Sequence, residues 1–71
     1  MPDSVYRVTE VVGVSSDSWE AAARVAVETA AKRVRELRVA EVVRQDLTVQ
    51  DGGILNYRIR LGISFKYEPS E

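Results

Sequence analysis

The sequence contains no cysteine and no histidine among its 71 residues. Disulfide bonds are therefore excluded, as are the zinc and haem sites that depend on these two residue types. A domain of this size buries only about 60% of its unfolded surface, so a single copy would be marginally stable. Small domains usually compensate with disulfides, a structural metal or oligomerisation. The composition therefore predicts one domain, residues 1–71, that assembles with copies of itself.

A surplus of one charge sign and a long apolar run are also missing. Ten basic residues face eleven acidic ones, and the net charge is −1, which is not the basic footprint of a nucleic-acid-binding protein. No apolar run approaches the roughly 20 residues that a membrane-spanning helix needs, and the N-terminus has neither the basic nor the apolar region of a signal peptide. We therefore expect a soluble, cytoplasmic protein without nucleic-acid or membrane partners.

The first half of the chain predicts a strand and then a helix. Residues 4–13 are rich in β-branched side chains and end at a glycine, which favours a strand. Asp17 and Glu20 have capping-box spacing and predict a helix over residues 17–36. Trp19 is interpreted as a core anchor of this helix. The predicted helix has an apolar stripe at spacings of three and four, which consists of Trp19, Ala22, Ala23, Ala26, Ala30, Val34 and Leu37.

The second half predicts a long β-hairpin. Strands are expected at residues 38–50 and 53–67, joined by a turn that contains the pair Asp51-Gly52. Simple alternation would place on one side of the earlier strand Val39, Glu41, Val43, Gln45, Leu47 and Val49. In the later strand, polar residues alternate with Leu55, Tyr57, Ile59, Leu61, Ile63, Phe65 and Tyr67. The fold class is thus α+β, with β-α-β-β order and one helix covering a three-stranded antiparallel sheet.

The predicted strands are longer than the helix that covers them. A helix of about 20 residues spans roughly 30 Å, whereas strands of about 13 residues would run roughly 43 Å. The overhanging apolar end of the sheet, with Leu47, Val49, Leu55 and Phe65 or Tyr67, therefore needs cover from another copy. The second face is expected to be an interior lining, a subunit interface or a solvated surface, because it carries Arg7, Arg44, Asp46, Arg58, Arg60 and Lys66.

Five stretches of the sequence share a pattern with a known family. They are Val5 to Val8, the strand end Glu10 to Gly13, Ser15 to Glu20 before the alanine-rich helix, Leu37 to Val43, and Tyr57 to Phe65. In this order and at this length they resemble dodecins, over nearly the whole chain. The resemblance implies a protomer whose sheet wraps around its helix and which assembles as a hollow homododecamer with cubic symmetry.

The resemblance also bears on the ligand. Flavin-storing dodecins hold the flavin between a tryptophan and a glutamine, which the resemblance aligns with Val39 and Arg58. Valine offers no aromatic plate for stacking, and arginine only donates hydrogen bonds where an amide also accepts them. With Gln45-Asp46 nearby, the pattern is more similar to calcium dodecins. The resemblance thus implies a ligand pocket at Val39, Gln45 and Arg58, and calcium ion in place of flavin.

Calcium takes about six to eight oxygen ligands, and one chain has too few clustered carboxylates to supply them. Copies around a symmetry axis would share the site, and the candidate metal ligands are Asp46, Glu10 and Glu20. Each has a simpler alternative role: Glu10 pairs with Arg33 or another subunit, Asp46 pairs with Arg44 or Arg60, and Glu20 only completes the helix cap.

Two other hypotheses stay open. Arg58 and Arg60 would suit an anion site for a phosphate-bearing small molecule, including a flavin nucleotide, or the oligomer is purely structural. Catalysis is not expected, because the chain lacks histidine and cysteine and shows no nucleophile spaced beside a base. The sequence therefore predicts a protein that binds and stores an ion or small ligand.

Overall fold

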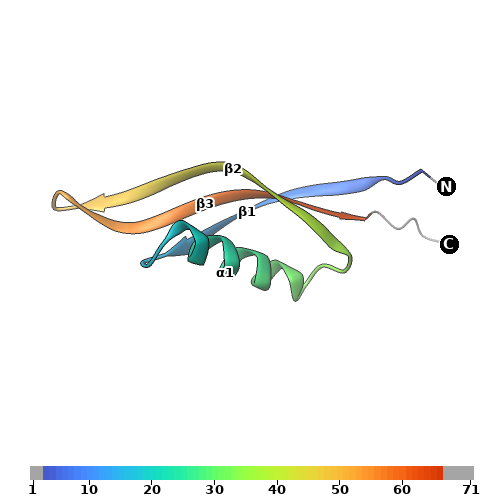
Figure 1. Cartoon of the computed structure of the whole chain (residues 1–71), viewed down its shortest axis with the longest axis horizontal. Coiled ribbons are helices and arrows are strands. Elements are labelled where there is room, and N and C mark those ends of the chain that lie inside the picture. Colours follow the sequence, from blue (N-terminus) through green and yellow to red (C-terminus); the bar gives the residue numbers. More distant parts are fainter. Residues whose placement is uncertain (1–2, 67–71) are drawn as a thin grey trace.

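The computed structural model describes residues 3–66. Strand β1 (Tyr6–Ser15) is followed by helix α1 (Trp19–Ala31) and by the long strands β2 (Leu37–Gln50) and β3 (Gly53–Lys66). The sheet has the order β1-β3-β2, and β3 pairs antiparallel with both neighbours. Helix α1 lies along one face of this sheet (Figure 1). The predicted α+β class and β-α-β-β order are confirmed; Tyr67, assigned to the last strand, lies outside the described residues.

Helix α1 begins at a different cap from the one predicted. The N-cap is Ser18, whose hydroxyl accepts a hydrogen bond from the backbone N–H of Ala21 at 3.0 Å. Asp17 lies one residue earlier, where its backbone N–H donates to the hydroxyl of Ser15. The capping-box prediction was therefore wrong, because the residue three positions after the true cap is Ala21, although Glu20 does lie in the first turn, where the helix dipole favours a carboxylate.

The helix ends at Ala31, well before the predicted end at residue 36. The segment from Lys32 to Glu36 contains neither glycine nor proline, so the apolar spacing continued past the true end. Glu36 adopts a left-handed φ of 61° and accepts a hydrogen bond from the backbone N–H of Lys66, which directs Leu37 into β2. Within residues 3–66 no helix is long and apolar enough to cross a membrane.

The core lies between α1 and the central strand. Three alanines of the predicted stripe are buried against three branched residues of β3; the six are Ala22, Ala26, Ala30, Ile59, Leu61 and Ile63. The alanines let the helix approach the sheet closely. At Gly13 of β1, a Cβ atom would lie 2.1 Å from the carbonyl oxygen of Ala22, so only glycine fits there.

The β2–β3 hairpin closes as predicted from the Asp-Gly pair. Asp51 and Gly52 have φ values of 53° and 78°, and Gln50 pairs with Gly53 on either side of them. Two consecutive positive φ values are typical of a type I′ turn, whose twist matches that of the strands it joins.

Strand β2 does not present one uninterrupted row of alternating residues. Its register against β3 shifts at three places, between Leu37 and Val39, Val42 and Arg44, and Thr48 and Val49. Gln45 is therefore opposite Ile59, on the face that α1 covers, whereas Glu41 is opposite Gly62, on the face away from α1. The predicted single row from Val39 to Val49 was wrong, because a bulge moves the following residues to the other face.

The face of the sheet away from α1 is called the outer face below. Arg7 was expected on it but is opposite Phe65 in the register, and its guanidinium carbon lies 5.7 Å from the centre of that ring. Arg7 thus belongs to the helix side. Arg58 and Arg60 alternate with the buried Ile59 and Leu61 and therefore point to the outer face.

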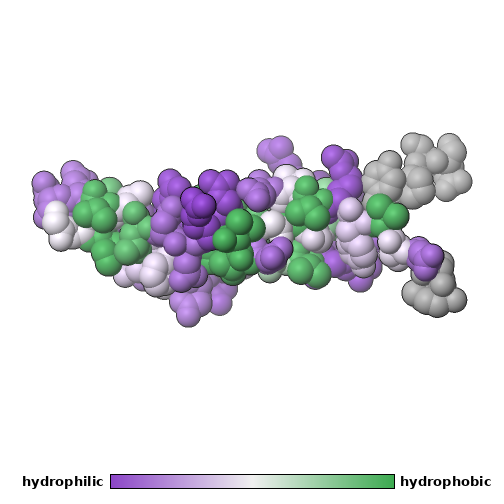
Figure 2. Space-filling view, turned by 90° about the horizontal axis from the view of Figure 1, so that it is seen from above, coloured by the Kyte–Doolittle hydropathy of each residue, from purple (hydrophilic) through white to green (hydrophobic). Residues whose placement is uncertain are grey.

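The chain is elongated, with extents of 54 × 20 × 17 Å. The sheet continues beyond both ends of α1 (Figure 1), and much apolar surface stays exposed, as the overhang prediction required. Figure 2 shows apolar patches separated by a strongly hydrophilic band. The exposed large apolar residues include Val5, Tyr6, Val8, Val12, Val14, Val25, Val39, Val42, Val43, Leu47, Val49, Ile54 and Leu55.

Candidate functional site

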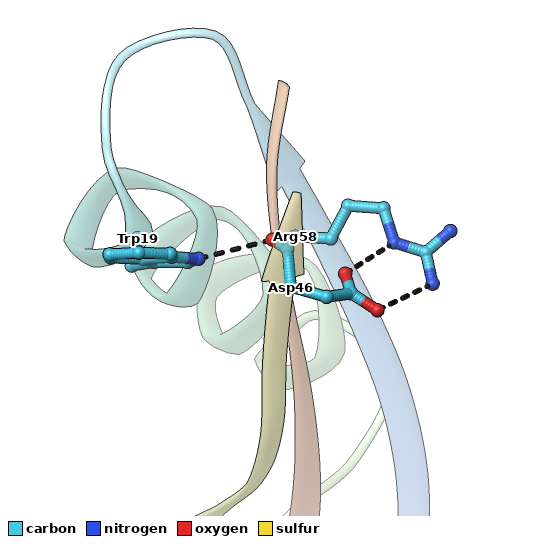
Figure 3. Close-up of polar contacts among 3 residues, drawn as sticks. All are labelled: Trp19, Asp46 and Arg58. Atoms are coloured by element: carbon cyan, nitrogen blue, oxygen red, sulfur yellow. Dashed lines mark hydrogen bonds and ion pairs between the residues drawn. The ribbon is translucent and has the colours of Figure 1, made fainter. Parts of the chain in front are cut away.

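An arginine–aspartate pair lies at the centre of the candidate site. Asp46 on β2 is directly opposite Arg58 on β3. Arg58 Nε donates to Asp46 Oδ1 at 2.8 Å, and Arg58 Nη2 donates to Asp46 Oδ2 at 3.4 Å (Figure 3). Both carboxylate oxygens are therefore engaged by one guanidinium. The two side chains keep 43% and 38% of their surface exposed, so the pair is open to solvent and to exchange.

The backbone of Asp46 is held from the opposite side of the sheet by Trp19. The indole Nε1 donates a hydrogen bond to the carbonyl oxygen of Asp46 at 3.2 Å (Figure 3). The indole ring also meets Tyr57 edge to face, with centroids 5.3 Å apart and an interplanar angle of 79°. Trp19 packs against the core, as the predicted anchor should. It therefore links the start of α1 to the strand position that carries the aspartate.

A second ion pair lies on the same face. Arg60 Nη1 donates to Glu10 Oε1 on β1 at 3.2 Å. Arg60 is also directly opposite Arg44 on β2, and like charges in this position are unfavourable. Glu10 thus offsets a repulsion between two cations.

Both ion pairs differ from the alternatives predicted from the sequence. Asp46 pairs with Arg58 and not with Arg44 or Arg60, and Glu10 pairs with Arg60 and not with Arg33. Arg58 and Arg60 each have a carboxylate partner in one chain, and their role in an anion site stays a prediction.

The remaining candidates are divided between the two faces. Glu20 and Gln45 line a hollow of about 350 Å³ on the helix side, together with Trp19, Ala23, Val42 and Ile59. Val39 lies on the outer face, opposite Ser64, and is 55% exposed. One chain therefore does not bring Gln45 into a common pocket with Val39 and Arg58, nor Glu20 beside Asp46 and Glu10. The ligand roles of these residues stay predictions.

A larger groove of about 570 Å³ lies between α1 and the edge strand β1. Its walls are mostly apolar and include the exposed Val12, Val14 and Val25, with Arg33 among the lining residues. It contains none of the predicted metal ligands.

The acidic groups have the right chemistry for calcium but not the number. Hard carboxylate oxygens suit this ion, and Asp46 and Glu10 present theirs on one face. However, residues 3–66 contain no group of three or more potential metal ligands. A shell of about six to eight oxygens would need several copies of the chain.

A third ion pair joins Glu36 and Arg38. Arg38 lowers the pKa of Glu36 through a hydrogen bond and through its positive charge.

Comparison with known proteins gives consistent results. A sequence model of the family Dodecin matches residues 5–68. Calcium dodecin of Mycobacterium tuberculosis is 46% identical over 68 residues, which cover 96% of this chain and 96% of that protein.

Two solved structures show the same similarity in three dimensions. One, of calcium dodecin from Mycobacterium tuberculosis "with a novel calcium-binding site", has a TM-score of 0.81 and 47% identity and covers 96% of this chain and 97% of that one. The structure of dodecin from Streptomyces coelicolor has a TM-score of 0.91 and 37% identity and covers 99% of this chain and 100% of that one.

Proposed function

This chain belongs to the dodecin family, and we propose that it binds and stores calcium ions as a closed homododecamer. The observation that carries the proposal is the 46% identity to a calcium dodecin over almost the full length of both proteins. The same proposal has three further parts: the protein binds a ligand and does not catalyse a reaction, the ligand is a small ion, and the partners are other copies of the chain. The cytoplasmic location stays a prediction.

The distribution of apolar residues supports the assembly. The buried core consists of six residues, and three of them are alanines. Large apolar side chains stay exposed on both faces, for example Val8 at 64%, Val49 at 65% and Ile54 at 54%. Each such side chain contributes about 1.5–3 kcal/mol when it is fully buried. Contacts between copies would therefore add much of the stability that the small core lacks.

Two observations support calcium over flavin. At the position that the family resemblance assigns to the stacking tryptophan, Val39 presents no aromatic ring. At the position of the amide partner, Arg58 is already engaged by Asp46. Carboxylate oxygens at Asp46 and Glu10, repeated around an axis of the assembly, match the oxygen preference of calcium. Glu20 is the third candidate. It would bind calcium where the helix side of one copy contacts another copy.

Calorimetric titration of the assembled protein with calcium chloride tests the proposal. We expect the wild type to bind calcium and Asp46→Asn to bind it more weakly, because an amide oxygen lacks the charge of a carboxylate. Asp17→Asn is the matched control, since Asp17 is exposed in the loop before α1. Sedimentation of each variant should give the wild-type mass. A wild type that binds no calcium would overturn the proposal, whereas unchanged affinity in Asp46→Asn would exclude only Asp46 as a ligand.

A further inference from the structure

The carboxylate that is our first candidate for calcium already holds a cation. Arg58 reaches both oxygens of Asp46, at 2.8 and 3.4 Å. The hydrogen bond to Oδ1 is short and the one to Oδ2 is long, so the guanidinium binds Oδ1 more strongly than Oδ2. A calcium ion at 2.3–2.6 Å from either oxygen would take the space and the lone pairs that Arg58 uses.

We infer that Arg58 competes with calcium for the carboxylate of Asp46. The ion binds Asp46 only when the guanidinium of Arg58 moves away. The inference rests on the proposed calcium function and adds a residue that sets its affinity. The pairing would lower the calcium affinity of Asp46, which therefore stays with Arg58 at low calcium concentration.

The strength of the competition follows from the exposure of the pair. The side chains of Arg58 and Asp46 are 38% and 43% exposed, and exposed ion pairs typically contribute about 0–1 kcal/mol. A full 1 kcal/mol corresponds to a factor of about five in an equilibrium constant. The positive charge of Arg58 also repels the ion directly. A substitution that removes both the ion pair and the repulsion between Arg58 and calcium should raise the calcium affinity about three- to tenfold.

Trp19 provides a signal for the exchange. It is the only tryptophan in the chain, and its indole N–H is bonded to the backbone carbonyl of Asp46 itself. A change in the position of Asp46 therefore changes the surroundings of the indole. Tryptophan emission should respond to calcium in the wild type and much less in Asp46→Asn.

The test compares two variants that remove the same charge from the same face. Arg58→Gln removes the competitor. Arg44→Gln is the matched control, because Arg44 is opposite Arg60 and makes no ion pair with any carboxylate within residues 3–66. Calcium chloride is titrated into each assembled protein, and binding is followed by calorimetry and by Trp19 emission. We expect about three- to tenfold tighter binding for Arg58→Gln and less than about twofold for Arg44→Gln.

Arg58→Lys covers the case in which Arg58→Gln does not fold. Lysine keeps the charge but loses the planar fork, so its affinity should lie between those of the wild type and Arg58→Gln. If a folded Arg58 variant binds calcium no more tightly than Arg44→Gln, the inference fails while the calcium function stands. If the wild type binds no calcium, the proposed function fails and the inference fails with it.

Discussion

Gly13 should be the least replaceable small residue of the fold. A Cβ atom at this position of β1 would lie 2.1 Å from the carbonyl oxygen of Ala22 and 2.9 Å from the Cβ of Ala26. The first atom belongs to the helix backbone and cannot rotate away, so α1 would have to move by about 1 Å to restore ordinary contact. Overpacking of a core costs about 1–3 kcal/mol, and we place Gly13→Ala at the upper end.

Thermal unfolding at one fixed protein concentration measures this cost. For a chain of this size, about 2–3 kcal/mol corresponds to a fall in Tm of about 10–20 °C. Gly62→Ala is the control, because its added Cβ would lie 3.6 and 3.7 Å from methyl groups of Val43 and Val8, at ordinary contact distance. We expect the control to melt close to the wild type. A Gly13→Ala protein that melts within about 3 °C of the wild type would refute the close packing of α1 on β1.

Three smaller changes test other parts of the structure. Asp51→Ala should lower the unfolding free energy by about 1 kcal/mol, measured by denaturant titration, because alanine tolerates the left-handed φ of 53° poorly; Asp51→Asn should not. Trp19→Phe should cost about 1–3 kcal/mol in the same assay, since it removes the hydrogen bond to Asp46. Arg38 lowers the pKa of Glu36. The pair therefore adds to the unfolding free energy at pH values above the ordinary pKa of glutamate, and this contribution is lost as the pH falls through the lowered pKa. Thermal melts at acid pH should show no such loss in Glu36→Gln.

Element order and the hairpin turn could be predicted because their causes are local. The Asp51-Gly52 pair suits two positive φ values, and strict alternation in β3 identified the residues that face the helix. The end of α1 could not be predicted in this way. The segment after Ala31 contains neither glycine nor proline to mark the end, and the contact at the start of β2 comes from about 30 residues away, where the backbone N–H of Lys66 bonds the carbonyl oxygen of Glu36.

The pairing of Asp46 with Arg58 was missed for a similar reason. At the turn, Gln50 is opposite Gly53 and Val49 is opposite Ile54, and this register continued would place Asp46 opposite Tyr57. The shift between Thr48 and Val49 brings Arg58 there instead. The extra residue of this bulge is Leu55 in β3, because Ile54 is opposite Val49 and Asn56 is opposite Thr48. A leucine at this position does not indicate a bulge in the sequence.

Native mass spectrometry of the purified protein, before and after addition of calcium and of flavin in turn, tests the central claim most directly. We predict a homododecamer that persists on dilution, gains mass with calcium and gains none with flavin. A stable folded monomer, or a homododecamer that takes up flavin and ignores calcium, would contradict the account.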